Sequence, residues 1–91
     1  MPAPIRDWVL TAHAETELRR RGLGVAVLAT ILESPERRRP FRPGRDVLES
    51  RLEVDGKTYL IRVFVDVDRS PAEVVTAYRT SKLAKYWGDE P

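Results

Sequence analysis

Apolar residues recur at helical spacing in the first third of the chain. Ala14 and Leu18 lie four positions apart, which places them on one face of a helix predicted from residue 12 to 21. Thr11 stands where a helix N-cap is expected, and Gly22 is typical of the position just beyond a helix C-terminus. The pattern therefore predicts a first helix with its own start and stop signals.

A second helix is predicted from about residue 24 to 33, where apolar residues cover most of the helix circumference. A helix of this kind is largely buried in a folded protein. Pro35 ends it, because the residue before a proline disfavours the helical conformation. The link Leu23-Gly24 is so short that the two helices should form a tight helical hairpin.

The middle of the chain alternates between apolar and polar residues, which is the period of a β-strand. Asp55-Gly56 separates two alternating segments and is a strong signal for a β-hairpin. On the second segment, Ile61, Val63 and Val65 point to one face and Arg62 to the other. The apolar face needs a cover, which the second helix can supply. The expected contacts on that helix are Leu28, Ala29 and Leu32.

Shorter segments complete the predicted fold. Residues 8–10 form an apolar run that fits a strand at a sheet edge. Residues 37–45 contain prolines and a glycine, which indicates a loop or an irregular edge strand. A third strand is predicted from residue 73 to 78, and Thr80 or Ser81 should cap a short last helix that runs to about residue 87.

This order of elements predicts an α+β fold. Two N-terminal helices should pack on an antiparallel sheet of three to four strands, followed by a short C-terminal helix. The length fits a single domain, residues 1–91, with a core from about residue 9 to 87.

Composition narrows the chemistry. The chain has no cysteine and one histidine, and it lacks a zinc-protease motif, a P-loop and a dinucleotide-binding fingerprint, so we expect no metal site and no cofactor. It has no apolar signal-peptide core and no run long enough to span a membrane, which predicts a cytoplasmic protein without a membrane partner. Thirteen of its sixteen basic residues are arginine, whose planar fork suits phosphate.

Several basic residues are candidates for binding or chemistry. His13 is the only side chain that titrates near neutral pH without perturbation, so it is either an acid/base group or a structural histidine. Arg62 lies in the centre of an apolar strand, where it needs a carboxylate partner or lines a wet surface. Arg79 precedes a predicted helix start, which either binds an anion or is an ordinary cap.

Two further features point toward nucleic acid. Arg45 closes a run of five arginines within residues 37–45, and this run would suit nucleic acid, an acidic partner or a solvated loop. Tyr86 could stack on a base or donate a proton. Cleavage of RNA by its own 2′-hydroxyl needs proton transfer and cations on the phosphate, which these residue types supply without a metal.

Two segments resemble one uncharacterised bacterial family. The first is Leu10-Thr11-Ala12-His13-Ala14, followed by the Arg21-Gly22 turn and a helix that ends at Pro35. The second is Tyr78-Arg79-Thr80-Ser81-Lys82 with Lys85-Tyr86-Trp87. That family is similar to the BrnT and RelE toxins, which share a fold with barnase-like and colicin-type ribonucleases.

The resemblance implies a toxin of a toxin–antitoxin pair that acts as a metal-independent endoribonuclease. Its expected partners are an antitoxin protein and RNA, either free or on the ribosome, and a homodimer is left open. The implied catalytic residues are His13, Arg62, Arg79 and Lys82, and the implied substrate-binding residues include Thr80 and Ser81. His13 and Arg79 are then expected to face one groove, together with Arg62 or the turn at residues 80–82. The alternative is a non-catalytic RNA- or protein-binding domain of the same fold, or an accessory protein that docks an antitoxin.

Overall fold

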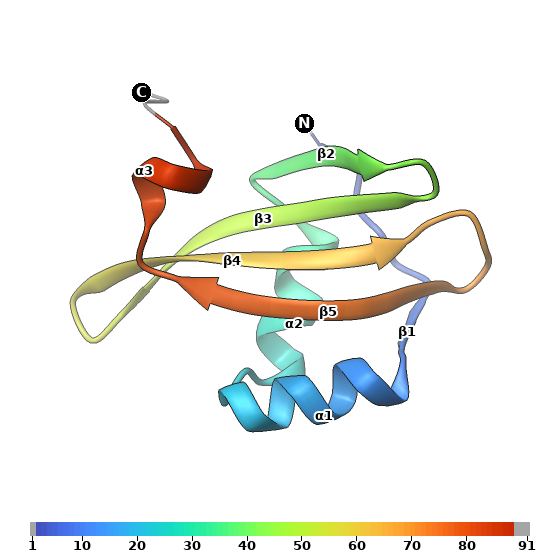
Figure 1. Ribbon diagram of the computed structural model, residues 1–91, viewed down its shortest axis with the longest axis horizontal. Helices are drawn as coiled ribbons and strands as arrows, with labels where there is room; N and C mark the ends of the chain where they lie inside the picture. The colour runs from blue at the N-terminus through green and yellow to red at the C-terminus, as the bar shows by residue number, and fades with distance from the viewer. Residues whose placement is uncertain (1, 89–91) are drawn as a thin grey trace.

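Five strands and three helices make up the computed structural model, which describes residues 2–88 (Figure 1). In chain order the elements are β1 (Trp8–Leu10), α1 (Ala12–Arg21), α2 (Val25–Glu33), β2 (Arg37–Arg42), β3 (Arg45–Val54), β4 (Lys57–Asp66), β5 (Ala72–Thr80) and α3 (Leu83–Tyr86). Strands account for more of these residues than helices do. None of the described helices is both long and apolar enough to cross a membrane.

The strands form one mixed sheet in the order β1-β5-β4-β3-β2. β1 runs parallel to β5, and every other pairing is antiparallel. The predicted antiparallel sheet of three to four strands is therefore wrong, since the described residues form five strands with one parallel pair. The short run at residues 8–10 contains no signal for its direction, and that direction is set by pairing with a strand far along the chain.

The central hairpin has the predicted turn. Asp55 and Gly56 have φ angles of 51° and 79°, and positive values at both positions are typical of the two-residue turn that follows strand twist. Val54 pairs with Lys57, and the β3–β4 register continues over ten residue pairs. β2 is an edge strand with an irregularity between Pro40 and Arg42, so the second of the two alternatives for residues 37–45 holds.

One face of the sheet packs on α1 and α2, and Figure 1 shows α2 passing behind the strands. Val63, Val65, Leu28 and Leu32 have no exposed surface, and Ile61 is also buried. The predicted contact between β4 and the second helix is confirmed, although Ala29 is only half-buried. We call the opposite side of the sheet the open face, because neither α1 nor α2 covers it.

The helix ends follow the sequence signals at α1 but not at α3. The Thr11 hydroxyl accepts a hydrogen bond from the Ala14 N–H at 3.0 Å, and Gly22 is left-handed with a φ of 67°. At α3 the residue before the helix is Lys82, and no side chain caps the first turn. The Thr80 hydroxyl instead accepts from the Lys82 N–H at 3.1 Å, so the helix begins later than predicted.

Replacing Thr11 with alanine should lower the free energy of unfolding by about 1 kcal/mol, because the first turn of α1 loses its cap. Urea denaturation followed by circular dichroism measures the change. Thr16→Ala is the matched control, since Thr16 is exposed on the same helix, and it should change stability by less than about 0.5 kcal/mol. Equal losses of stability in the two variants would show that the cap at Thr11 does not set the cost.

Candidate functional site

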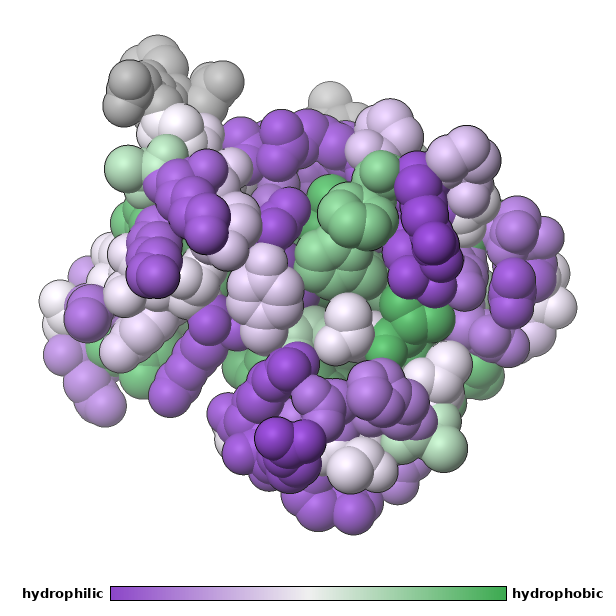
Figure 2. Space-filling model, viewed as in Figure 1, coloured by the Kyte–Doolittle hydropathy of each residue, from purple (hydrophilic) through white to green (hydrophobic). Residues whose placement is uncertain are grey.

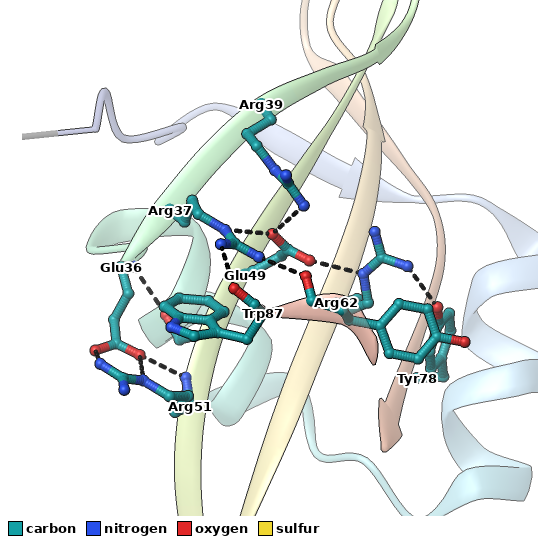
Figure 3. A network of polar contacts seen from close by, with 10 residues as sticks. Glu36, Arg37, Arg39, Glu49, Arg51, Arg62, Tyr78 and Trp87 are labelled. Carbon is teal, nitrogen blue, oxygen red and sulfur yellow. Dashed lines mark hydrogen bonds and ion pairs between the residues drawn. The ribbon is translucent and has the colours of Figure 1, made fainter. Parts of the chain in front are cut away.

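A buried carboxylate organises the open face. Glu49 on β3 has no exposed surface, and its two oxygens contact three arginines (Figure 3). Arg37 Nε lies 2.9 Å from one oxygen and Arg62 Nε lies 2.7 Å from the other. Arg39 approaches the first oxygen at 3.3 Å. We call these four residues the Glu49 cluster.

Strand register builds the Glu49 cluster. Glu49 sits directly opposite Arg37 on β2 and Arg62 on β4. Arg39 is two positions beyond Arg37, and residues two apart on a strand share a face. Burying a carboxylate is costly unless charge and hydrogen bonds compensate it. The described residues meet this demand, since they contain no buried side-chain nitrogen or oxygen without a hydrogen-bond partner.

Arg62 links the cluster to an aromatic neighbourhood. Its second contact is to the Tyr78 hydroxyl, which accepts a hydrogen bond at 2.8 Å. Burial opposes the charge on Arg62, but Tyr78 and Glu49 outweigh it, so the pKa of Arg62 lies above its ordinary value. Of the two explanations for an arginine in an apolar strand, the carboxylate partner is the one that the structure contains.

Four aromatic rings follow one another across the open face. Phe41 on β2 packs edge-on against Phe64 on β4, with ring centres 4.9 Å apart. Phe64 lies 6.0 Å from Tyr78 on β5, and Tyr78 lies 6.3 Å from Tyr86 on α3. We call these four the aromatic row. Phe41 is 54% exposed, which is unusual for a large apolar side chain. In space-filling form, apolar side chains reach the surface near the middle of this face and hydrophilic ones surround them (Figure 2).

The end of the described chain lies against the same surface. Arg62 sits 4.7 Å from the centre of the Tyr86 ring, a cation–π contact. Lys85 and then Tyr78 lower the pKa of Tyr86 from its ordinary value of 10.0. The lowered pKa reflects hydrogen bonds from these two side chains to the Tyr86 hydroxyl, to which the charges of Lys85 and Arg62 add.

Four of the predicted site residues lie at the open face. Thr80 is one of them, because it is opposite Leu60 and two positions beyond Tyr78 on β5. Arg62 and Tyr86 meet there, as described. Arg45 is also on this face, but its guanidinium binds Asp66 opposite it on β4 at 2.6 Å. Arg45 thereby holds the pKa of Asp66 below its ordinary value. Arg45 therefore contributes positive charge to the surface, but part of its hydrogen-bonding capacity is taken up by Asp66.

The other predicted site residues lie elsewhere. Arg79 is opposite Ile61 in the register, which puts it on the helix-covered side, where its guanidinium stacks 5.0 Å from the Tyr59 ring. His13 is exposed in the first turn of α1, next to the start of β5, where Thr11 donates a hydrogen bond to the Val74 carbonyl. At about 3.3 Å per strand residue, Arg79 lies about 16 Å farther along β5 than Val74.

The turn after β5 adds no further contact to the Glu49 cluster. Ser81 and Lys82 are exposed and Thr80 is half-buried, with its hydroxyl used in the turn. All of the predicted residues are within the described part of the chain, and the structure does not bring His13 together with Arg79 or Arg62. The expected common groove is not formed by these residues.

Sequence reasoning missed most of the residues at this surface. Arg37 and Arg39 belong to the basic run at residues 37–45, and their spacing of two, which Phe41 continues, is the signal that places them on one face of a strand. Glu49 stands between Leu48 and Ser50, and nothing local marks it as the partner of Arg62. Trp87 entered the sequence analysis only through the resemblance, and its ring lies against Arg37 of the cluster.

The open face combines positive charge with aromatic surface. Its charged residues on β2, β3 and β4 carry three more positive than negative charges: Arg37, Arg39, Arg42, Arg45, Arg51 and Arg62 against Glu49, Glu53 and Asp66. Arg42 is exposed and forms no ion pair with the described residues. Guanidinium groups can bind phosphate or carboxylate, and exposed aromatic rings can stack on flat groups.

Among residues 2–88 no group of three or more histidine, aspartate or glutamate side chains is arranged to hold a metal ion. Comparison with protein-family models, with curated proteins and with solved structures finds no match to this chain.

Proposed function

We propose that this protein binds single-stranded RNA on the open face of its sheet. The observation that carries the proposal is the Glu49 cluster beside the aromatic row. Arginine binds phosphate through its planar fork, and aromatic rings stack on unpaired bases. The two features lie side by side, because Arg62 belongs to the cluster and contacts the rings of Phe64 and Tyr86.

The Glu49 cluster is suited to hold arginines ready for a ligand. Glu49 binds the Nε atoms of Arg37 and Arg62. The terminal nitrogens of these two guanidinium groups are therefore not bound to Glu49. Arg39 is the most exposed of the three, with 48% of its side chain accessible. Groups already oriented lose less conformational entropy on binding. Arg39 is therefore one expected phosphate contact. Arg42 is the other, because it is exposed and forms no ion pair with the described residues. Phe41 is the expected stacking platform.

Binding is tested by fluorescence polarisation with a labelled RNA of about 12 nucleotides and mixed sequence. The wild-type protein should bind at low salt, with a log–log salt slope of about −2, as expected for about three phosphate contacts on a single strand. Phe41→Ala should weaken binding about tenfold, through loss of one stacking contact. Leu52→Ala is the matched control, because Leu52 is an exposed apolar residue on the other side of the sheet, and it should leave affinity unchanged. Absence of binding at low salt would refute the proposal.

Ribonuclease activity and the toxin–antitoxin partnership stay predictions from the resemblance. The distance of His13 from Arg62 and Arg79 supports binding over cleavage as the function of this face. The same RNA, incubated with the protein in EDTA and run on a denaturing gel, should be recovered intact. Cleavage that disappears in His13→Ala would favour the ribonuclease instead.

A further inference from the structure

The segment from residue 83 to 88, which we call the C-terminal strap, occupies one end of the Glu49 cluster (Figure 3). The terminal nitrogens of Arg37 donate to two main-chain oxygens of the strap, that of Tyr86 at 2.8 Å and that of Trp87 at 3.3 Å. The Trp87 ring centre lies 3.9 Å from the Arg37 guanidinium and 4.8 Å from the Arg51 guanidinium. Two cationic forks thus hold one flat ring and two oxygen acceptors.

Both arginines are fixed by carboxylates rather than by the strap. Arg37 is held through Nε by Glu49, and Arg51 is held by both oxygens of Glu36 at 3.1 and 3.0 Å. Each of the two guanidinium groups therefore has a carboxylate partner that does not belong to the strap. A pair of fixed forks with a flat space between them suits a nucleotide, since the phosphate accepts hydrogen bonds and the base stacks.

The strap itself is weakly anchored. α3 has four residues, none of them buried, and no side chain caps its first turn. Its contacts with the sheet are hydrogen bonds to main-chain oxygens, cation–π contacts and the edge-on contact of the Tyr86 ring with Tyr78, all at a partly exposed surface. Segments with few buried apolar contacts are the ones that open most readily.

We propose that Arg37 and Arg51 form a nucleotide subsite, and that Trp87 fills it until RNA binds. The Trp87 ring stands where a base would stack, and the main-chain oxygens of Tyr86 and Trp87 stand where phosphate oxygens would accept from Arg37. RNA binding at this end of the open face displaces the strap, and Tyr86 with it, so that Phe41, Phe64 and Tyr78 are the rings of the aromatic row that stay on the sheet. The inference rests on the proposed RNA binding, and it adds the position of one subsite and its internal competitor.

If Trp87 competes with RNA for this subsite, its removal should strengthen RNA binding, whereas removal of a residue that stacks on RNA should weaken it. If a ligand binds only when the strap is open, its apparent affinity equals its intrinsic affinity multiplied by the fraction of molecules in which the strap is open. Trp87→Ala in the full chain should therefore bind the same labelled RNA about fivefold to tenfold more tightly than wild type. Trp8→Phe is the matched control, because Trp8 lies in β1, away from this surface, and its affinity should equal that of wild type.

A second measurement follows the strap directly. In the Trp8→Phe background Trp87 is the one remaining tryptophan, and saturating RNA should raise the quenching of its fluorescence by acrylamide. If wild type binds RNA but Trp87→Ala binds equally or less well, or if RNA shields Trp87 from acrylamide, the subsite proposal is wrong and RNA binding stands. If neither protein binds RNA, the proposed function fails as well.

Discussion

Replacing Glu49 with glutamine should lower the free energy of unfolding by about 3 kcal/mol, near the lower end of the range for breaking a buried ion pair. The side chain keeps its size, but Arg37, Arg39 and Arg62 lose the charge that they share. Arg37 and Arg62 are only 19% and 11% exposed, so water compensates them incompletely. Urea denaturation of the two proteins measures the difference.

Glu15→Gln is the matched control for this substitution. Glu15 pairs with Arg19 on the exposed surface of α1, and surface pairs of this kind contribute little, so its loss should stay below about 0.5 kcal/mol. A second test adds Arg62→Met to the Glu49→Gln variant, where it removes surplus positive charge. There it should cost less than in the wild-type protein, a coupling that a double-mutant cycle measures. Additive costs would show that the residues do not act as one cluster.

Neutralising two arginines of the open face should weaken RNA binding about 100-fold. In Arg39→Gln with Arg42→Gln, two exposed cationic donors are lost, and a hydrogen bond to a charged group contributes about 1.5–3 kcal/mol. Two such losses at the low end of that range already exceed a factor of about 100. Fluorescence polarisation with the same labelled RNA gives the ratio, and the salt slope should fall toward zero as phosphate contacts disappear.

The matched control changes net charge by the same amount at another place. Arg19 and Arg79 are exposed on the helix-covered side of the molecule, and Arg19→Gln with Arg79→Gln should change affinity by less than about threefold. If both pairs weaken binding equally, affinity follows the net charge of the protein, and the open face is not the binding surface.

Local signals predicted the parts of this fold that local physics determines. Thr11 and Gly22 marked the ends of α1 because capping and left-handed geometry restrict which residues fit. Asp55-Gly56 fixed the central hairpin, and the alternation around Arg62 gave its register correctly. Each of these features depends on residues that are close together in the sequence.

The unpredicted parts depend on residues that are far apart in the sequence. The parallel pairing of β1 with β5 joins the two ends of the chain, and no local pattern specifies it. Glu49 became important because β2 and β4 place Arg37 and Arg62 opposite it, which only the strand order determines. The expected site was carried over from a resemblance, and strand pairing put Arg62 and Arg79 on opposite faces.

The pairing of β1 with β5 has a consequence for synthesis on the ribosome. Trp8 and Leu10 leave the exit tunnel 64 residues before their partners Ala72 and Val74 do. The docking of α1 also depends on β5, because Arg21 at the end of α1 donates a hydrogen bond to the Ala77 carbonyl of β5. A nascent chain that stops before β5 can form the β3–β4 hairpin but not the finished sheet. Completion of this domain is therefore tied to the release of its last strand, and the growing chain keeps an apolar N-terminal segment without its sheet partner until then.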